Sequence, residues 1–103
     1  MIIKVYAKTD AGLKGVQEHY KDSRKLKNRL TLKAHGVKQT IDGKVLIISL
    51  EKLIEKIKDK GGSVDAITGK MKDDFLIDVQ KQMSLFNAEK GRDYEVVFND
   101  TKQ

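Results

Sequence analysis

The stretch Val37–Lys60 reads VKQTIDGKVLIISLEKLIEKIKDK and combines the signals of a hairpin, a strand and a helix. Asp42-Gly43 predicts a two-residue turn, because both residue types tolerate the positive φ that tight hairpins need. The run Lys44–Ile48 that follows is apolar and rich in β-branched residues, which is typical of a strand covered on both faces. The stretch therefore predicts an antiparallel hairpin whose second strand is buried in a sheet.

A helix is predicted directly after this strand. Ser49 stands where its hydroxyl can cap the helix, and Gly61-Gly62 supplies the left-handed conformation that ends helices. Four apolar side chains recur at the spacing of one helical face: Leu50, Leu53, Ile54 and Ile57. We expect this face to be buried against the sheet.

Working outward, three further strands are expected, at Ile2–Ala7, Leu30–Ile41 and Tyr94–Phe98. In the long second strand the alternation of apolar residues shifts by one position at Gly36, which predicts a β-bulge there. The last residues, Asn99–Gln103, are expected to be a frayed tail.

Helices are expected after Thr9-Asp10 and after Ser63, both of which offer capping side chains. Gly12 and Gly15 weaken the start of the first helix, at a cost of roughly 1 kcal/mol each relative to alanine. Gly69 is expected to interrupt the later helical region, and a further helix then begins near Asp73, with its apolar face toward the core.

The sequence therefore predicts one α+β domain over residues 1–103, with an antiparallel or mixed four-stranded sheet in the order β-α-β-β-α(α)-β. This order matches the split β-α-β arrangement of ferredoxin-like folds, in which the first and third strands are central. About 45 residues separate Ile48 from Tyr94, which is long for one crossover helix. We expect two or three helical pieces there, which leaves another α+β topology open.

The composition excludes several classes of function. The 103 residues contain no cysteine, so the chain has no disulfide, no thiolate nucleophile and no cysteine-based zinc site. No apolar run approaches the ~20 residues of a membrane span. The N-terminus lacks the layout of a signal peptide. A cytoplasmic location without a membrane partner is the expectation.

Positive charge is concentrated in the first half of the chain. Residues 1–52 hold 12 Lys and Arg against five Asp and Glu, whereas residues 53–103 hold nine against 10. Eight of the basic residues lie within Lys14–Lys38, together with only two acids, Glu18 and Asp22. This asymmetry favours a polyanionic partner. The alternative is a lysine-rich composition with one solvated basic helix.

The candidate nucleic-acid-binding residues come from this basic segment: Lys21, Arg24, Lys25, Lys27, Arg29 and Lys33. On a helix the first three would share a face, and cations of this kind bind phosphates without needing a sequence code. Tyr20 beside them is a candidate for stacking on an unpaired base. Tyr20 also continues an apolar stripe from Leu13 and Val16, which favours a core position.

Catalytic residues are scarce. His19 and His35 are the only histidines, and neither accompanies a Ser-His-Asp grouping. Asp74 and Asp78 are spaced to share a helix face and could hold a cation, but acids near a helix start also stabilise the helix dipole. No enzyme activity, no metal and no cofactor are expected.

The first hypothesis is therefore a small basic binding protein that contacts nucleic acid or a nucleoprotein complex through its N-terminal half. A standard RNA-recognition motif does not fit, because the strand at Lys44–Ile48 has no aromatic residue and the first strand offers only Tyr6. The alternative is a protein-binding regulator or inhibitor of the kind that phages and plasmids encode, whose basic surface meets an acidic protein surface. A homo-oligomer stays open.

Overall fold

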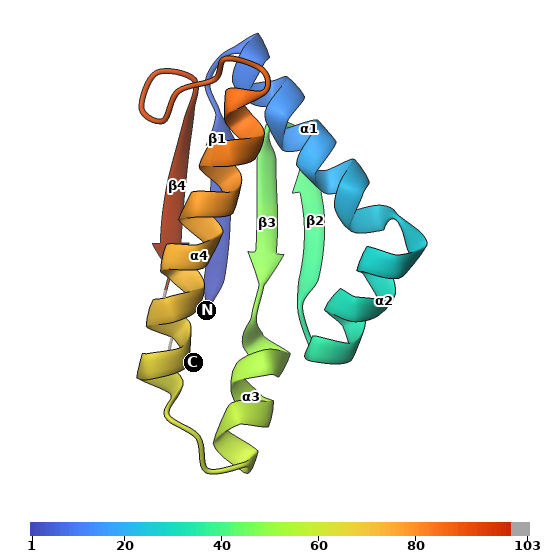
Figure 1. Ribbon diagram of the computed structural model, residues 1–103, viewed down its shortest axis with the longest axis vertical. Coiled ribbons are helices and arrows are strands. Elements are labelled where there is room, and N and C mark those ends of the chain that lie inside the picture. Colours follow the sequence, from blue (N-terminus) through green and yellow to red (C-terminus); the bar gives the residue numbers. More distant parts are fainter. Residues whose placement is uncertain (100–103) are drawn as a thin grey trace.

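The computed structural model describes residues 1–99, in which one four-stranded antiparallel sheet packs with helices (Figure 1). The elements along the chain are β1 (Ile2–Ala7), α1 (Asp10–Arg24), α2 (Leu26–His35), β2 (Lys38–Asp42), β3 (Val45–Ser49), α3 (Glu51–Asp59), α4 (Val64–Ser84) and β4 (Tyr94–Asn99). The strand order β2-β3-β1-β4 makes β1 and β3 central. Asn99, predicted to start a frayed tail, ends β4, and the rest of that tail lies outside the described residues.

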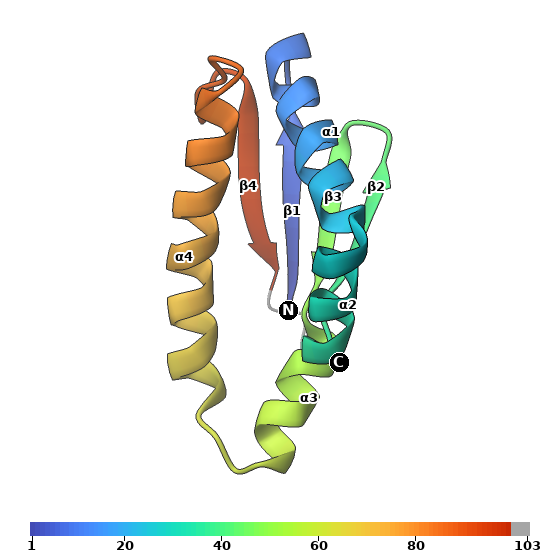
Figure 2. The same cartoon turned by 45° about the vertical axis from the view of Figure 1, so that its right-hand side comes forward.

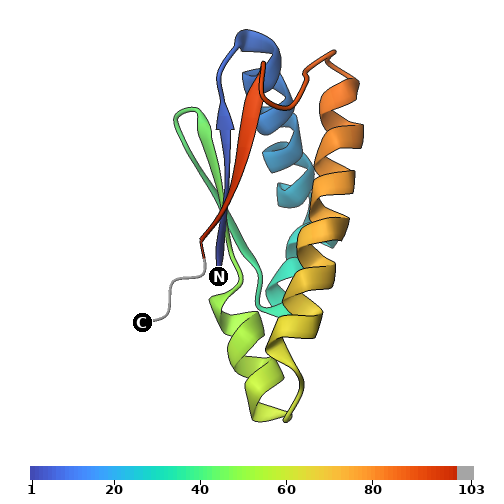
Figure 3. The same cartoon turned by 90° about the vertical axis from the view of Figure 1, so that its left-hand side faces the viewer.

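The helices α1 and α4 lie on the same face of the sheet, as Figure 3 shows. Figure 2 shows α3 extending beyond the end of the sheet, where β3 leads into it. The core between sheet and helices is built from apolar side chains of both layers: Ile3, Val5, Leu46, Ile48, Val16, Val79, Met83 and Tyr94. The opposite face of the sheet is covered by no helix within residues 1–99, and Tyr6 and Val97 are exposed there.

The predicted α+β class, the four strands and the central position of the first and third strands are confirmed. The chain is not a plain ferredoxin-like domain, which has one helix in each crossover. Here α1 and α2 both precede β2, and α3 and α4 both precede β4. The long second crossover thus contains two helices, within the range that its length predicted.

The predicted strand at Leu30–Ile41 is wrong in its first half. Residues up to His35 belong to α2, and Gly36 ends that helix with φ 78°. The amide groups of Gly36 and Val37 bond the carbonyls of Lys33 and Leu32, which is the left-handed cap that glycine makes at helix ends. The shift in apolar parity at Gly36 therefore marks a helix terminus and not a β-bulge.

The hairpin turn lies one residue later than predicted. Asp42 pairs with Val45 across the ladder, so the two loop residues are Gly43 and Lys44. Only Gly43 has a positive φ, 60°, which is the glycine position of a type II′ turn. The hairpin itself is confirmed.

Three predicted helix signals have different outcomes. Thr9 and Ser63 cap α1 and α4 as expected, by accepting hydrogen bonds from the Gly12 and Ala66 amides. Ser49, predicted as a cap, is the last residue of β3, and α3 follows Leu50 without a side-chain capping bond. Gly69 does not interrupt α4, which is continuous from Val64 to Ser84.

Gly12 and Gly15 place α1 close to its neighbours. A Cβ atom on Gly12 would clash with the backbone carbonyl of Asp93, and one on Gly15 would clash with the Met83 sulfur. The conformational cost of these glycines is therefore offset by close packing of α1 against α4 and the segment before β4.

The buried Asp93 carboxylate holds that segment in place. Its oxygens accept bonds from the Thr9 hydroxyl at 2.6 Å, the Glu89 amide at 2.7 Å and the Arg92 Nε at 2.9 Å. These bonds, led by the one from Arg92 and followed by that from Thr9, lower the pKa of Asp93 to about 2. The carboxylate thereby ties the start of α1 to the loop that precedes β4.

Candidate nucleic-acid interface

A groove of about 730 Å³ lies among the C-terminal half of α1, α2, the edge strand β2 and the start of α3. Five of its lining residues are basic: Arg24, Arg29, Lys33, Lys38 and Lys52. Glu51 is the one acidic lining residue. The described structure thus brings together cations that are up to 28 positions apart in the sequence.

The groove exists because α2 stands away from the sheet. No side chain of α2 is buried, and the helix is held mainly at its ends. At the N-terminal end of α2 the backbone of Lys25 is extended, and the side-chain amide nitrogen of Asn28 donates to the backbone carbonyl of Asp22 at 2.7 Å. At the other end the Lys56 ammonium donates to the Ala34 carbonyl at 2.9 Å.

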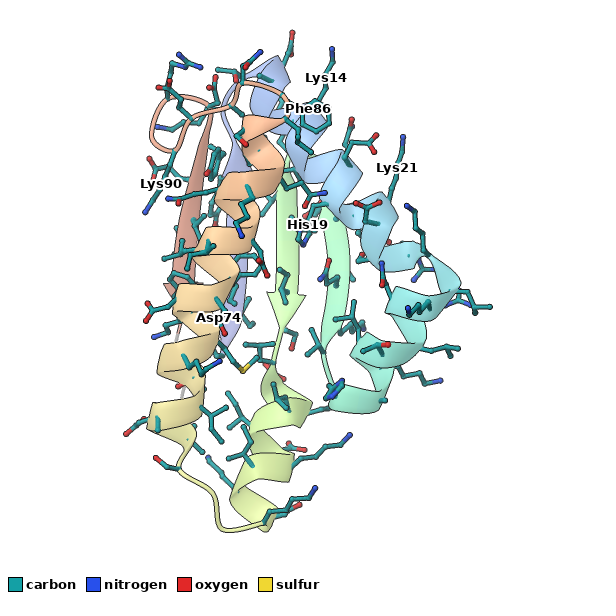
Figure 4. All side chains as sticks on the ribbon, viewed as in Figure 1. Lys14, His19, Lys21, Asp74, Phe86 and Lys90 are labelled. Atoms are coloured by element: carbon teal, nitrogen blue, oxygen red, sulfur yellow. The ribbon has the colours of Figure 1, made fainter. Side chains whose placement is uncertain are left out.

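The predicted cations divide into two sets. Arg24, Arg29 and Lys33 line the groove. Lys21 pairs with Glu18 at 3.4 Å and Lys25 with Asp22 at 3.1 Å. Lys27 is exposed and does not line the groove. Figure 4 shows Lys21 pointing away from the sheet, on the outer side of α1.

The predicted shared helical face of Lys21, Arg24 and Lys25 is wrong. α1 ends at Arg24, and Lys25 lies in the extended corner before α2. Tyr20 packs against the core, as its place in the apolar stripe predicted, and it also lines the groove. Its stacking on an unpaired base stays a prediction. The structure adds Lys38 and Lys52, which sequence reasoning missed because only the tertiary fold brings β2 and α3 beside α2.

A second, smaller pocket of about 250 Å³ adjoins the groove, and we call it the polar pocket. It shares Ser23, Leu32 and Gln39 with the groove. Its other lining side chains are polar: His19, Asp22, Asn28, Thr31 and Gln82. In contrast to the groove, the polar pocket contains no Lys or Arg.

Hydrogen bonds fix the side chains of the polar pocket. The Gln82 amide nitrogen donates to an Asp22 carboxylate oxygen at 3.2 Å, so the Gln82 amide oxygen faces His19 Nδ1. Because that oxygen can only accept, Nδ1 of His19 donates the hydrogen bond. The His19 ring also meets the edge of Phe75, with ring centroids 6.1 Å apart. Figure 4 shows His19 on the inner side of α1, toward α4.

The remaining residues singled out for chemistry lie apart from one another. His35 bonds the Thr31 carbonyl on its own helix, and Asp74 pairs with Lys70 at 3.1 Å. Within residues 1–99 there is no cluster of three or more His, Cys, Asp or Glu side chains placed to hold a metal ion.

Comparison with protein-family models, with curated proteins and with solved structures gave no significant match, so the function of the groove has to be inferred from its own residues. Among the helices of residues 1–99, none combines the length and apolar character needed to cross a membrane.

Proposed function

We propose that the protein binds nucleic acid, alone or within a nucleoprotein complex, through the groove between α2 and β2. The observation that carries the proposal is the convergence of five cationic side chains on a concave surface with a single acid. Cations on a concave, low-dielectric surface focus the field and attract a polyanion from solution. The proposal assigns binding and not catalysis.

Phosphate binding of this kind depends steeply on salt. Each neutralised phosphate releases counterions and contributes a slope of about −0.7 to −0.9 to a plot of log K against log salt. Two to four of the groove cations reaching phosphates would give a slope of about −2 to −4.

A charge-matched set of variants tests the proposal. Arg24→Gln, Arg29→Gln and Lys33→Gln together remove three cations from the groove. Lys21→Gln, Lys25→Gln and Lys27→Gln remove three from the outer surface nearby. The third set, Lys58→Gln, Lys60→Gln and Lys81→Gln, removes three exposed cations from α3, its C-terminal end and α4. All three sets lower the net charge equally.

We expect the groove set to weaken binding and flatten the salt slope far more than either other set, because its side chains converge on one path. Binding is measured by fluorescence anisotropy with labelled oligonucleotides of unrelated sequence. An equal loss in all three sets would show that net charge alone attracts the nucleic acid. Absence of binding by the parent at low salt would exclude the proposed function.

A second candidate function is supported by a different observation. Leu26 and Leu30 are 63% and 56% exposed, and as residues four apart they share a face of α2. Exposed leucines among basic residues suit a protein partner with an acidic, partly apolar surface. Retention of one protein partner after nuclease treatment of a pull-down, and its loss with Leu26→Ser/Leu30→Ser, would support a regulator or inhibitor instead.

A further inference from the structure

We propose that the polar pocket receives an unpaired base, so that the preferred ligand is single-stranded nucleic acid. The phosphates of the strand lie along the groove while one base enters between α2 and β2. This inference rests on the proposed function and narrows it from nucleic acid in general to one strand with accessible bases.

The two adjoining cavities have the two chemistries of a nucleotide. The groove is lined by five cations, which suit phosphate. The polar pocket is lined by neutral amides and hydroxyls, one imidazole and one carboxylate, which suit the donors and acceptors of a base edge. Because Ser23, Leu32 and Gln39 line both cavities, a single ligand can occupy the two together.

Gln39 supplies the most specific observation. Its side-chain oxygen is buried and has no hydrogen-bond partner among the described residues. An unsatisfied buried acceptor is unfavourable and uncommon in native proteins. Gln39 stands at the boundary of the two cavities, so a rotation of its amide would let the oxygen accept from an N–H of a bound base.

The polar pocket is also organised before a ligand arrives. Asp22, Gln82 and Asn28 are held by the hydrogen bonds described above, which leaves the Asn28 side-chain oxygen available as an acceptor. Tyr20 in the adjoining groove offers a ring for stacking. A base in a duplex has its hydrogen-bonding edge paired and its faces stacked, so it could enter only after being flipped out.

The test compares ligands that differ only in the bases they present. The probes are a labelled single strand of about 12 nucleotides, a hairpin duplex with the same number of phosphates, and a strand of equal length in which abasic sites replace the central nucleotides. A free mononucleotide serves as competitor. Anisotropy is measured at ~50 mM salt.

We expect the base-bearing strand to bind roughly ten-fold more tightly than the duplex or the abasic strand. Equal affinity for the base-bearing and abasic strands would overturn the inference while leaving the proposed function intact. Failure of all three probes to bind would overturn the proposed function itself. Full displacement of the labelled strand by the mononucleotide, at concentrations near the Kd of the strand, would show that a free nucleotide is the ligand. That result would overturn the inference that the ligand is a single strand.

A variant of Gln39 tests the pocket directly. Gln39→Met keeps a similar shape and removes the unpaired oxygen, so the melting temperature should not fall. The affinity for the base-bearing strand should fall toward that for the abasic strand. Gln80→Met, at an exposed position on α4, is the matched control and should bind as the parent does. Unchanged strand affinity in Gln39→Met, with a native melting temperature, would remove Gln39 and the base pocket from the interface.

Discussion

Three glycine-to-alanine substitutions in helices should have different effects on stability because their surroundings differ. At Gly69 in α4 an added Cβ meets nothing within 4 Å. Gly69→Ala should therefore raise the free energy of unfolding by about 0.5–1 kcal/mol, because alanine has the higher helix propensity. At Gly12 in α1 the same Cβ would collide with the Asp93 backbone carbonyl.

The cost at Gly12 is larger than the gain. The Asp93 carbonyl already accepts the Lys8 amide at 2.8 Å, so it cannot retreat without disturbing that bond. Overpacking of this kind typically costs about 1–3 kcal/mol, against a propensity gain of at most about 1 kcal/mol. Gly12→Ala should therefore lower the free energy of unfolding by about 1–2 kcal/mol. Gly15→Ala should fall between the two, since it displaces the flexible side chain of Met83.

Urea denaturation followed by circular dichroism measures all three variants. The expected order of stability is Gly69→Ala above Gly15→Ala above Gly12→Ala, with the first above the parent. If Gly12→Ala were as stable as Gly69→Ala, α1 would not approach the segment before β4 as closely as described.

Acid should weaken the link between α1 and the loop before β4. The lowered pKa of Asp93 means that its stabilising effect is complete above the ordinary pKa near 3.8 and is lost as pH falls toward about 2. Asp93→Asn should therefore reduce the pH dependence of the melting temperature between these two pH values. Ile54→Ala in α3 should cost about 1–2 kcal/mol in denaturation experiments, less than the roughly 2–5 kcal/mol of a fully buried position, because Ile54 is half-buried. Leu26→Ser with Leu30→Ser should change stability by less than about 0.5 kcal/mol, since both side chains are exposed; a larger loss would mean that α2 packs on the sheet.

The sequence predicted the elements whose local signals agree with their packing. The hairpin has β-branched strands and a glycine turn, and α4 has a capping serine and a buried face that includes Val79 and Met83. Such segments carry the same information at the local and the tertiary level.

The sequence did not predict α2, because the local pattern of its residues does not correspond to a buried face in the structure. The run from Leu30 to His35 alternates like a strand, and none of its side chains is buried in the structure. Without a buried face, periodicity cannot separate helix from strand. The shift of apolar parity at Gly36 predicted a β-bulge, whereas the glycine adopts the left-handed conformation that ends α2.

Half of the predicted cations line the groove, and this division could not be read from the sequence. Charge density identified the segment, but Lys21 and Lys25 pair with acids on α1. The polar pocket was not predicted at all. Gln39 and Gln82 are ordinary polar residues in sequence, and they line one pocket only because β2 and α4 both lie beside α1.

The attachment of α2 by its ends has a consequence for exchange of its amide hydrogens. A helix without buried side chains has little apolar contact to lose when it opens, so α2 should unfold locally at a small fraction of the global unfolding free energy. Its amides should then exchange with deuterium faster than those of α4 or of the central strands. Because α2 forms one wall of the groove, its local unfolding moves the cationic side chains of α2 away from the other cations that line the groove. Under the proposed function, melting of the ten residues of α2 would release a bound polyanion while the sheet stays folded.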